Sequence, residues 1–260
     1  MKCLITGSSG FLGQNLVPFL KEKGYEVSEF DMLDGNNIFD PVLEPYVIES
    51  DIVIHLAAQV SVQQSFENSS NSFHVNVLGT ARVVELCKRY GKKLIYPSSA
   101  AVYHPDLSPY AESKKMAEDI VRKVYADNSV ILRFFNIYGE NMNKNSGSIM
   151  YNFLHDDEIV VYGDGEQTRD YINVKDIVNI IESSIDDSWN GEIVDCGSGY
   201  AYSTNYVAGL FAHFRKKKIK YVPPKREIKW SIADTTRLKK LYKNSLQTNL
   251  LKDIEALCKV

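Results

Sequence analysis

The sequence predicts an α/β fold in which a doubly wound parallel sheet is combined with a smaller C-terminal lobe. In the first half, short β-branched runs alternate with longer segments whose apolar residues recur at spacings of three and four, which is the pattern of consecutive β-α-β units. After about residue 136 this alternation gives way to stretches rich in Gly, Asn and Asp, a composition typical of binding loops. The 260 residues are enough for one large domain or two modest lobes.

The first strand is expected at about 2–6, an apolar run that leads into a glycine-rich turn, and the first helix follows that turn at about 11–23. The later strands are β-branched runs, expected at about 25–30, 51–55, 93–97, 129–134 and 192–195. Amphipathic spacing predicts the later helices at about 69–90, 110–126 and 174–186. We therefore expect a sheet-bearing lobe of residues 1–136 with 171–197, and a smaller lobe of residues 137–170 with 198–260.

Composition excludes several classes of protein. Hydrophobic residues make up 44% of the chain and charged residues 24%, which argues against a disordered or fibrous protein. A formal net charge of -3 provides no basic field, so no nucleic-acid partner is expected. The four cysteines lie far apart without a CxxC pair, which predicts no disulfide framework, no metal site and a reducing, cytoplasmic location. No stretch reaches the roughly 18 apolar residues of a membrane span, so no membrane partner is expected.

A glycine-rich turn joins the first strand to the first helix. Gly7, Gly10 and Gly13 would let the backbone approach a pyrophosphate at the N-terminus of that helix. The same turn also suits strand-to-helix packing without a ligand, so alone it does not establish a nucleotide site. Asp31 ends the second strand, where a carboxylate can accept both ribose hydroxyls of an adenosine. Methionine and leucine follow Asp31 rather than arginine, which favours NAD over NADP.

A tyrosine, a lysine and a serine form the candidate reactive set. Tyr110 and Lys114 are one helical turn apart, so they share a face of the expected helix. A cation about 4 Å from a phenol, at an effective dielectric of about 20, is worth roughly 4 kcal/mol and would bring the phenol pKa from about 10 to near 7. Ser99 ends the fourth strand and could share the proton of a substrate alcohol. Tyr-x-x-x-Lys also occurs in ordinary amphipathic helices, so the weight lies on its order after the glycine turn, Asp31 and Ser99.

These motifs resemble those of the extended short-chain dehydrogenase/reductase family, specifically its NAD-dependent nucleotide-sugar epimerases and dehydratases. The resemblance covers nearly the whole chain. It rests on the glycine turn, HLAA at 55–58, NVLGT at 76–80, SSAAVY at 98–103, the Tyr110 and Lys114 pair, RFFNIYG at 133–139 and GDGEQTRD at 163–170. It implies a Rossmann-type sheet, NAD as the cofactor, a nucleotide-diphosphate sugar as the substrate and a C-terminal lobe that binds this sugar nucleotide.

Carried over position by position, the family pattern implies that Tyr110 is the base, Lys114 its partner and ribose anchor, and Ser99 the hydroxyl that shares the substrate proton. It implies cofactor contacts for the residues Gly7, Gly10, Phe11, Leu12, Gly13, Asp31, Asn37, Ile38, Leu56, Ala57, Ala58, Asn76, Tyr110, Lys114 and Phe135. It implies substrate contacts for Ser99, Tyr110, Asn136, Arg169, Arg226 and Ser231, since guanidinium forks suit phosphate oxygens. The alternative for the last group is ordinary surface arginines and a turn asparagine.

Two alanines narrow the reaction. In the family's 4,6-dehydratases an Asp-Glu pair follows the reactive hydroxyl residue, and decarboxylating members keep a glutamate there. Here the two positions are Ala100 and Ala101, whose methyl groups transfer no protons. The resemblance therefore implies 4-epimerase chemistry, in which oxidation and reduction at one carbinol pass through a bound 4-keto sugar.

One small residue bears on the choice of sugar. In related 4-epimerases, the residue three positions before an Ala-Asp aspartate near the C-terminus controls the space beside C2. Aligned on Ala233-Asp234, this residue is Ser231, which predicts that N-acetylated hexoses are accepted. The loop between Tyr103 and Tyr110 is also shorter than in most relatives, which would open this border of the pocket.

Two alternatives to an epimerase remain open on the sequence alone. A 4-keto-sugar reductase would use the same Tyr110 and Lys114, and a silent NAD-sensing regulator would need only the scaffold. No hydrolase, metalloprotease or P-loop motif is present in the sequence. Family members usually dimerise through two helices that correspond to 69–90 and 110–126, so a homodimer is expected.

Overall fold

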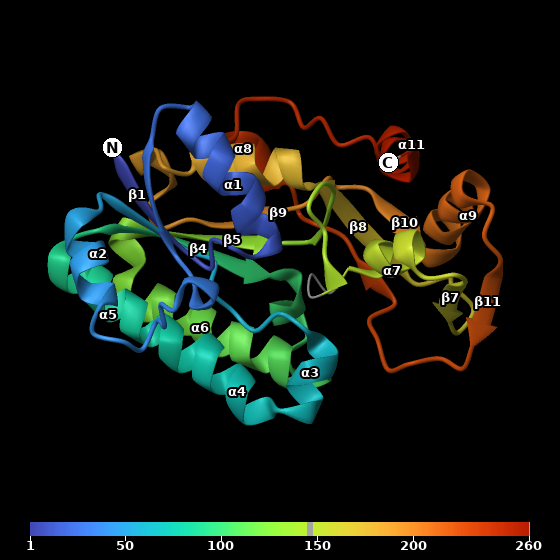
Figure 1. Ribbon diagram of the computed structural model, residues 1–260, viewed down its shortest axis with the longest axis horizontal. Coiled ribbons are helices and arrows are strands. Elements are labelled where there is room, and N and C mark those ends of the chain that lie inside the picture. The colour runs from blue at the N-terminus through green and yellow to red at the C-terminus, as the bar shows by residue number, and fades with distance from the viewer. Residues whose placement is uncertain (145–147, 260) are drawn as a thin grey trace. The chain divides into compact units, whose positions relative to one another are not determined.

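The computed structural model describes residues 1–144 and 148–259, which fall into two compact units (Figure 1). The first unit is Met1–Arg133 with Val178–Val194, and the second is Phe134–Ile177 with Asp195–Val260. The second unit thus includes 134–136, 171–177 and 195–197, which the sequence analysis placed with the sheet.

A six-stranded sheet runs in the order β2-β1-β3-β4-β5-β9, and this confirms the predicted α/β class with a parallel central sheet. Cys3 pairs with Val27 on one side and with Ile52 on the other. The strand order therefore reverses at β1, and the carboxyl ends of β1 and β3 form the edge where open α/β sheets bind ligands. The strands are β1 (Lys2–Thr6), β2 (Glu26–Phe30), β3 (Ile52–His55), β4 (Lys93–Ser99), β5 (Ser129–Phe134) and β9 (Ile193–Cys196).

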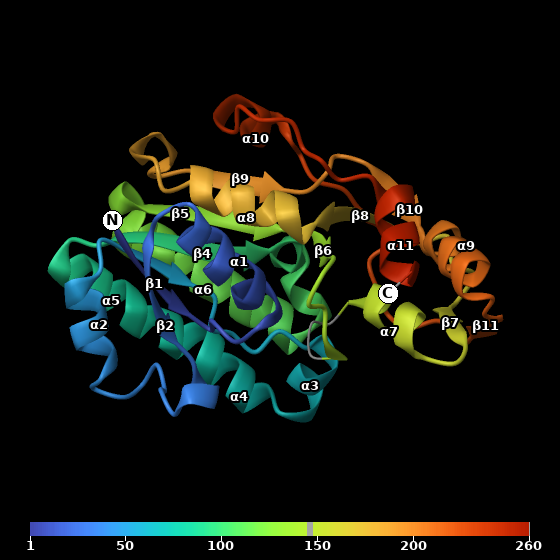
Figure 2. The same ribbon diagram turned by 45° about the horizontal axis from the view of Figure 1, so that its top comes forward.

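Helices cover both faces of this sheet (Figures 1 and 2). α1 (Phe11–Glu22) and α8 (Val174–Ser183) lie on one face, and α2 (Leu43–Glu49), α5 (Thr80–Tyr90) and α6 (Pro109–Tyr125) lie on the other. On the second face, fully buried side chains of the helices and strands form one core, because parallel strands are covered on both sides. A short helix, α3 (Val62–Glu67), follows β3.

The helix expected at 69–90 consists of three consecutive segments. α4 (Ser69–Phe73) continues into a π-helical turn, η2 (His74–Gly79), and then into α5. π-turns occur frequently at functional sites because they re-aim side chains within a helix. Asn76 lies on this turn and is 1% exposed.

The second unit is built from short elements that the sequence analysis did not assign. β8 (Thr168–Asn173) pairs antiparallel with β10 (Ala201–Ser203) and parallel with β12 (Trp230–Ser231) and β6 (Asn136–Tyr138). β7 (Ile159–Tyr162) and β11 (Ile219–Val222) form a separate parallel pair. The helices are α7 (Ile149–His155), α9 (Thr204–Arg215), α10 (Thr236–Leu241) and α11 (Leu250–Lys259). None of the helices formed by residues 1–144 and 148–259 has the length and apolar character of a membrane span.

Candidate active site

The glycine-rich turn between β1 and α1 is packed too tightly for side chains. Gly7 has a positive φ of 75°, and a Cβ there would lie 2.6 Å from the backbone nitrogen of Ala57. A Cβ on Gly13 would lie 2.2 Å from the carbonyl oxygen of Ser8. Among the described residues, no side chain caps the N-terminus of α1. The first amide groups of α1 are therefore free to bind an anion.

Asp31 lies immediately after β2 and contacts this turn. Its Oδ2 accepts a hydrogen bond from the Ser9 amide at 3.0 Å, and its Oδ1 accepts one from the Leu33 amide at 2.9 Å. Each oxygen keeps a further lone pair, so the oriented carboxylate can accept hydroxyl groups as well. Asn37 and Ile38 follow in the segment between β2 and α2. Ile38 packs so close to Gly79 that a Cβ there would lie 2.3 Å from its Cδ1.

Ser99 and Tyr110 lie side by side in the first unit. Ser99 ends β4, and its hydroxyl accepts a hydrogen bond from the Ala101 amide at 3.1 Å. Tyr110 is in the first turn of α6, which is capped by the hydroxyl of Ser108 at 3.1 Å from the Ala111 amide. Burial raises the pKa of Tyr110, and the hydrogen bond with Ser99 lowers it in part. The phenol and the hydroxyl are therefore within proton-sharing distance.

The expected lowering of the Tyr110 pKa by Lys114 is wrong for this arrangement. The Lys114 ammonium donates to the carbonyl oxygen of Pro97 at 2.7 Å and lies 4.5 Å from the centre of the Tyr96 ring. Burial lowers the pKa of Lys114 to about 7, although the charge of Glu118 raises it. Because both groups are buried, desolvation disfavours the phenolate and the ammonium alike. Burial is therefore the main influence on the Tyr110 pKa, and the lysine does not lower it as the spacing alone suggested.

Asn76 forms hydrogen bonds both to the loop after β3 and to α6. Its amide nitrogen donates to the Gln59 carbonyl at 3.0 Å and to the Ser113 hydroxyl at 2.9 Å, and its oxygen accepts from the Gln59 amide at 2.8 Å. Ser113 lies between Tyr110 and Lys114 on the sequence of α6. Asn76 thus holds the loop after β3 against the helix that carries the reactive pair. Leu56, Ala57 and Ala58 form the start of this loop and are half-buried.

His55, at the end of β3, is a buried neutral side chain. Its Nδ1 is 2.7 Å from the Thr6 hydroxyl, and its Nε2 is 3.2 Å from the Thr80 hydroxyl. Burial lowers the pKa of His55 to about 3, and the nearby charge of Lys114 acts in the same direction. The histidine of the HLAA motif therefore joins β1, β3 and α5 as a hydrogen-bonding strut.

Ala100 and Ala101 follow Ser99 directly. They open a short 3-10 helix, η3 (Ala100–Tyr103), and both are half-buried. At these positions, side by side with the reactive hydroxyl, the chain presents methyl groups.

The remaining site residues of the sequence analysis lie in the second unit. Arg169 is on β8, where it is in register with Tyr202 of β10 and Ser231 of β12. Its guanidinium forms an ion pair with Glu227 at 2.5 Å. Arg226 is exposed, next to Glu227 in the chain. The structure thus brings Arg169 and Ser231 together and places Arg226 at the surface.

Two further predicted site residues of this unit form hydrogen bonds to neighbouring strands, Asn136 to β8 and Phe135 to β9. The Asn136 amide donates to the Asp170 carbonyl oxygen at 2.9 Å. Phe135 is 6% exposed, and its backbone amide donates to the Cys196 carbonyl oxygen.

Sequence reasoning missed Glu227 and Glu118. Glu227 pairs with Arg169 across 58 positions of sequence, and burial raises its pKa while Arg169 lowers it. Glu118 is buried and pairs with Arg133. The one signal in the sequence that could have indicated Glu118 is its position one helical turn after Lys114.

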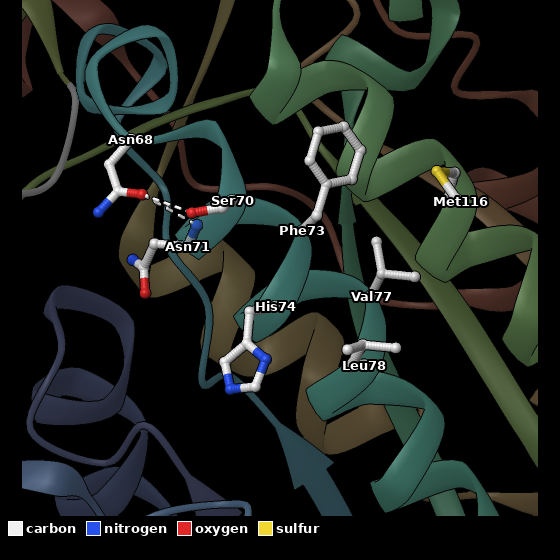
Figure 3. Close-up of a pocket in the computed structure, with 8 residues that line it drawn as sticks. All are labelled: Asn68, Ser70, Asn71, Phe73, His74, Val77, Leu78 and Met116. Carbon is white, nitrogen blue, oxygen red and sulfur yellow. Dashed lines mark hydrogen bonds between the residues drawn. The ribbon is translucent and has the colours of Figure 1, made fainter.

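A separate hollow lies on the surface of the first unit (Figure 3). Its apolar wall includes Phe73, Val77, Leu78 and Met116, from α4, η2 and α6. Leu78 is 57% exposed and Met116 42%. At one end of the hollow Asn68 accepts hydrogen bonds from Ser70 and from the Asn71 amide. The reactive set does not line this hollow. In the part of the chain that is described, no three His, Cys, Asp or Glu side chains gather as a metal site.

The chain is similar in sequence and in fold to known proteins. Residues 3–197 match the model of the NAD dependent epimerase/dehydratase family. A putative UDP-glucose 4-epimerase of Methanocaldococcus jannaschii is 32% identical over 86% of this chain and 87% of its own length. A UDP-N-acetyl-alpha-D-glucosaminuronate decarboxylase of Bacillus cytotoxicus is 29% identical over 80% of this chain and 78% of its own. The solved structure of MoeE5 in complex with UDP-glucuronic acid and NAD has a TM-score of 0.89 and 25% identity, over 100% of this chain and 98% of that one.

Proposed function

The chain belongs to the NAD-dependent epimerase/dehydratase family, and from this premise we propose that it epimerises a nucleotide-activated hexose at C4 through a bound 4-keto sugar. The substrate class we propose is UDP-N-acetylglucosamine and UDP-N-acetylgalactosamine, or UDP-glucose and UDP-galactose. The observation that carries the proposal is the reactive set of Ser99 and Tyr110 with two alanines beside it.

The residues of the first unit fit NAD. Substituents on Gly7 or Gly13 would collide with backbone atoms, so the turn keeps its amides bare at the start of α1, where a pyrophosphate binds. The Asp31 carboxylate is held by two amides with lone pairs directed elsewhere, as an adenosine ribose requires. Asn37 and Ile38 would flank the adenine side, and Leu56 to Ala58 the pyrophosphate side. Lys114 would anchor the second ribose.

The reaction needs a base and an acid at one hydroxyl. Bound NAD would supply reversible hydride transfer at C4 of the sugar. Tyr110 Oη takes the proton from the C4 hydroxyl, and the Ser99 hydroxyl hydrogen-bonds to the same substrate oxygen. Tyr110, which acts as the phenolate, then gives this proton back to the oxygen of the 4-keto sugar, so each turnover ends with the phenolate regenerated.

Ala100 and Ala101 support epimerisation over the reactions of other family members. Loss of water, or loss of CO2 from a sugar carboxylate, needs a further acid or base beside the reactive hydroxyl. The two methyl groups occupy the positions that follow Ser99, and neither transfers a proton. Relatives of this chain include a decarboxylase. Ala100 and Ala101 are therefore the feature that favours epimerisation over decarboxylation in our proposal.

The second unit supplies the proposed substrate contacts. Arg169 carries a guanidinium suited to a diphosphate, and Ser231 is in register with it on the neighbouring strand. A serine at this position leaves room beside C2 of the sugar, so we propose that N-acetylated hexoses are accepted. Asn136, Arg226 and Phe135 are the further proposed contacts, the first two with substrate and the last with the cofactor.

We propose a homodimer that pairs the helices at 69–90 and 109–125. The hollow of Figure 3 supports this, because exposed Leu78 and Met116 lie together on η2 and α6. Covering such a wall with the same helices of a second copy would remove its apolar surface from water.

A single incubation tests the function. Purified protein is mixed with UDP-N-acetylglucosamine or UDP-glucose without added cofactor, and the anomeric protons are followed by NMR. Appearance of the C4 epimer supports redox-neutral chemistry with NAD retained on the enzyme. Consumption of a 4-keto sugar with stoichiometric NADH or NADPH, and no epimer, would make the chain a reductase. Tyr110→Phe is the control, and it should lower the turnover rate by a factor of roughly 100 to 10,000 while NAD stays bound. If the protein were an NAD-sensing regulator, the same substitution would not change its function.

A further inference from the structure

A buried ion pair lies beside the reactive set. Glu118 is 2% exposed, and Arg133 donates to its carboxylate twice, from Nε to Oε2 at 3.0 Å and from Nη2 to Oε1 at 2.6 Å. The Ser98 hydroxyl donates to the same Oε2 at 2.7 Å. Both carboxylate oxygens are therefore engaged by groups of two other elements.

The ion pair joins the elements that carry the reactive residues. Ser98 precedes Ser99 on β4, Glu118 lies one turn after Lys114 on α6, and Arg133 is near the end of β5. Arg133 also donates from Nη1 to the Tyr103 hydroxyl at 2.8 Å, at the end of η3. The pair thus fixes the rotation of α6 relative to the strand that ends in the reactive hydroxyl.

Stability alone does not account for such a pair. Removing two charges from water is unfavourable, and buried ion pairs are often no better than well-packed apolar residues. Glu118, however, is one helical turn after the buried Lys114, and its charge raises the pKa of that lysine.

The groups around Lys114 can be named from each element. His55 of β3 is neutral, Tyr96 of β4 presents its ring, and Tyr110 is on α6 itself. Burial lowers the pKa of Lys114, and Glu118 is the group that raises it. Glu118 in turn faces Arg133, whose pKa it raises, and Tyr96. On the more exposed side of the helix, Asp119 forms ion pairs with both Lys115 and Arg122.

We propose that Glu118 is a positioning residue: held by Arg133 and Ser98, its carboxylate anchors α6 to β4 and keeps the neighbouring Lys114 charged in the buried site. This deepens the proposed function, because Lys114 lies one helical turn after Tyr110 and is the proposed anchor of the second ribose of the cofactor. The role is electrostatic as well as structural, so substitutions of Glu118 and of Arg133 should shift the pKa of Lys114 in opposite directions.

The direct test is the titration of Lys114 in the whole protein. The protein is labelled with lysine enriched in 13Cε, and the Lys114 signal is identified by its loss in Lys114→Met. In Glu118→Gln, which keeps the size of the side chain and removes the charge, the midpoint should fall by on the order of one pH unit. In Arg133→Met, which leaves the Glu118 charge unopposed, the midpoint should rise. Asp119→Asn, on the exposed side of the same helix, should leave it unchanged.

Turnover gives a second readout with the same signs. The high-pH limb of kcat should move to lower pH in Glu118→Gln and to higher pH in Arg133→Met. If Arg133→Met does not fold, Glu118→Gln/Arg133→Met is measured instead, and its midpoint should lie above that of Glu118→Gln.

An unchanged Lys114 midpoint in Glu118→Gln, or a fall in both single variants, overturns the proposal. The titration needs no substrate. If the midpoints shift as stated and no sugar is epimerised, the role of Glu118 stands and the proposed reaction fails.

Discussion

The Lys114 ammonium donates a hydrogen bond to the Pro97 carbonyl oxygen across 2.7 Å. This bond joins α6 to β4 at a position two residues before Ser99. The same ammonium lies 4.5 Å from the centre of the Tyr96 ring. Lys114 is therefore a buried cation with one carbonyl partner and one aromatic face. Its environment favours loss of the proton, and this has consequences for stability and for pH dependence.

Lys114→Met should stabilise the protein and inactivate it. The pKa of Lys114 falls from 10.5 to about 7 on burial, so between these values the unfolded chain binds more protons and stability rises with pH. Methionine removes the buried charge at similar length, so the free energy of unfolding at pH 7 should increase and its rise toward pH 10 should flatten. Urea unfolding at pH 7 and pH 9.5 measures both. A destabilised variant with an unchanged pH slope would show that Lys114 is not a strained cation.

His55 should make the fold sensitive to acid. Burial lowers the pKa of His55 to about 3 in the folded protein, from an ordinary value of 6.5. The unfolded chain therefore binds more protons between these values, and stability that is complete above pH 6.5 is lost as the pH falls, by up to about 1.4 kcal/mol per pH unit. His55→Gln should lower stability at pH 7, because the struts to Thr6 and Thr80 weaken, but should flatten the slope between pH 6 and 4.5. Equal slopes for both proteins would contradict a neutral buried histidine.

Ser231→Tyr should change the choice of sugar. A tyrosine in register with Arg169 would fill the space proposed for the C2 substituent. Turnover of UDP-N-acetylglucosamine relative to UDP-glucose should then fall by about 10-fold or more, since steric exclusion of one small group is worth roughly 1 to 3 kcal/mol. The ratio of kcat/KM for the two sugars measures this. The same ratio in variant and parent would remove Ser231 from the account of specificity.

The apolar hollow of Figure 3 should be covered in solution. Leu78→Glu places a charge on its wall and should convert a dimer to a monomer, whereas Val42→Glu, at a similarly exposed apolar position before α2, should not. Sedimentation velocity at micromolar concentration separates the two states. A monomeric parent protein, or a dimer that tolerates Leu78→Glu, rules out this face as the interface.

Much of the first unit could be predicted because its signals are local. The runs at 2–6 and 129–134 are apolar and β-branched, and the sheet buries them on both faces, so composition and position agree. The glycine turn and Asp31 could be found because their spacing in sequence reflects their contact, seen in the hydrogen bond from Ser9 to Asp31. The π-turn around Asn76 has no such signal, and the hydrogen bonds of Asn76 go to Gln59 and Ser113, which are 17 and 37 positions away in the sequence.

The second unit was harder to predict because its strands are very short. β12 has two residues and β10 three, too few for an alternating pattern, and both exist only through pairing with β8. The ion pair of Arg169 with Glu227 depends on the same pairing. The direction of Lys114 depends on the Pro97 carbonyl, and the spacing of Tyr110 and Lys114 alone could not reveal this competitor.

The central claim is that C4 is oxidised and reduced on one enzyme with the same hydrogen. UDP-N-acetylglucosamine carrying deuterium at C4 is incubated with the protein in ordinary water, without added cofactor, and the epimer is analysed by mass spectrometry and proton NMR. The account predicts that the epimer forms and keeps its deuterium at C4. An epimer whose C4 deuterium has been replaced by solvent hydrogen would contradict it.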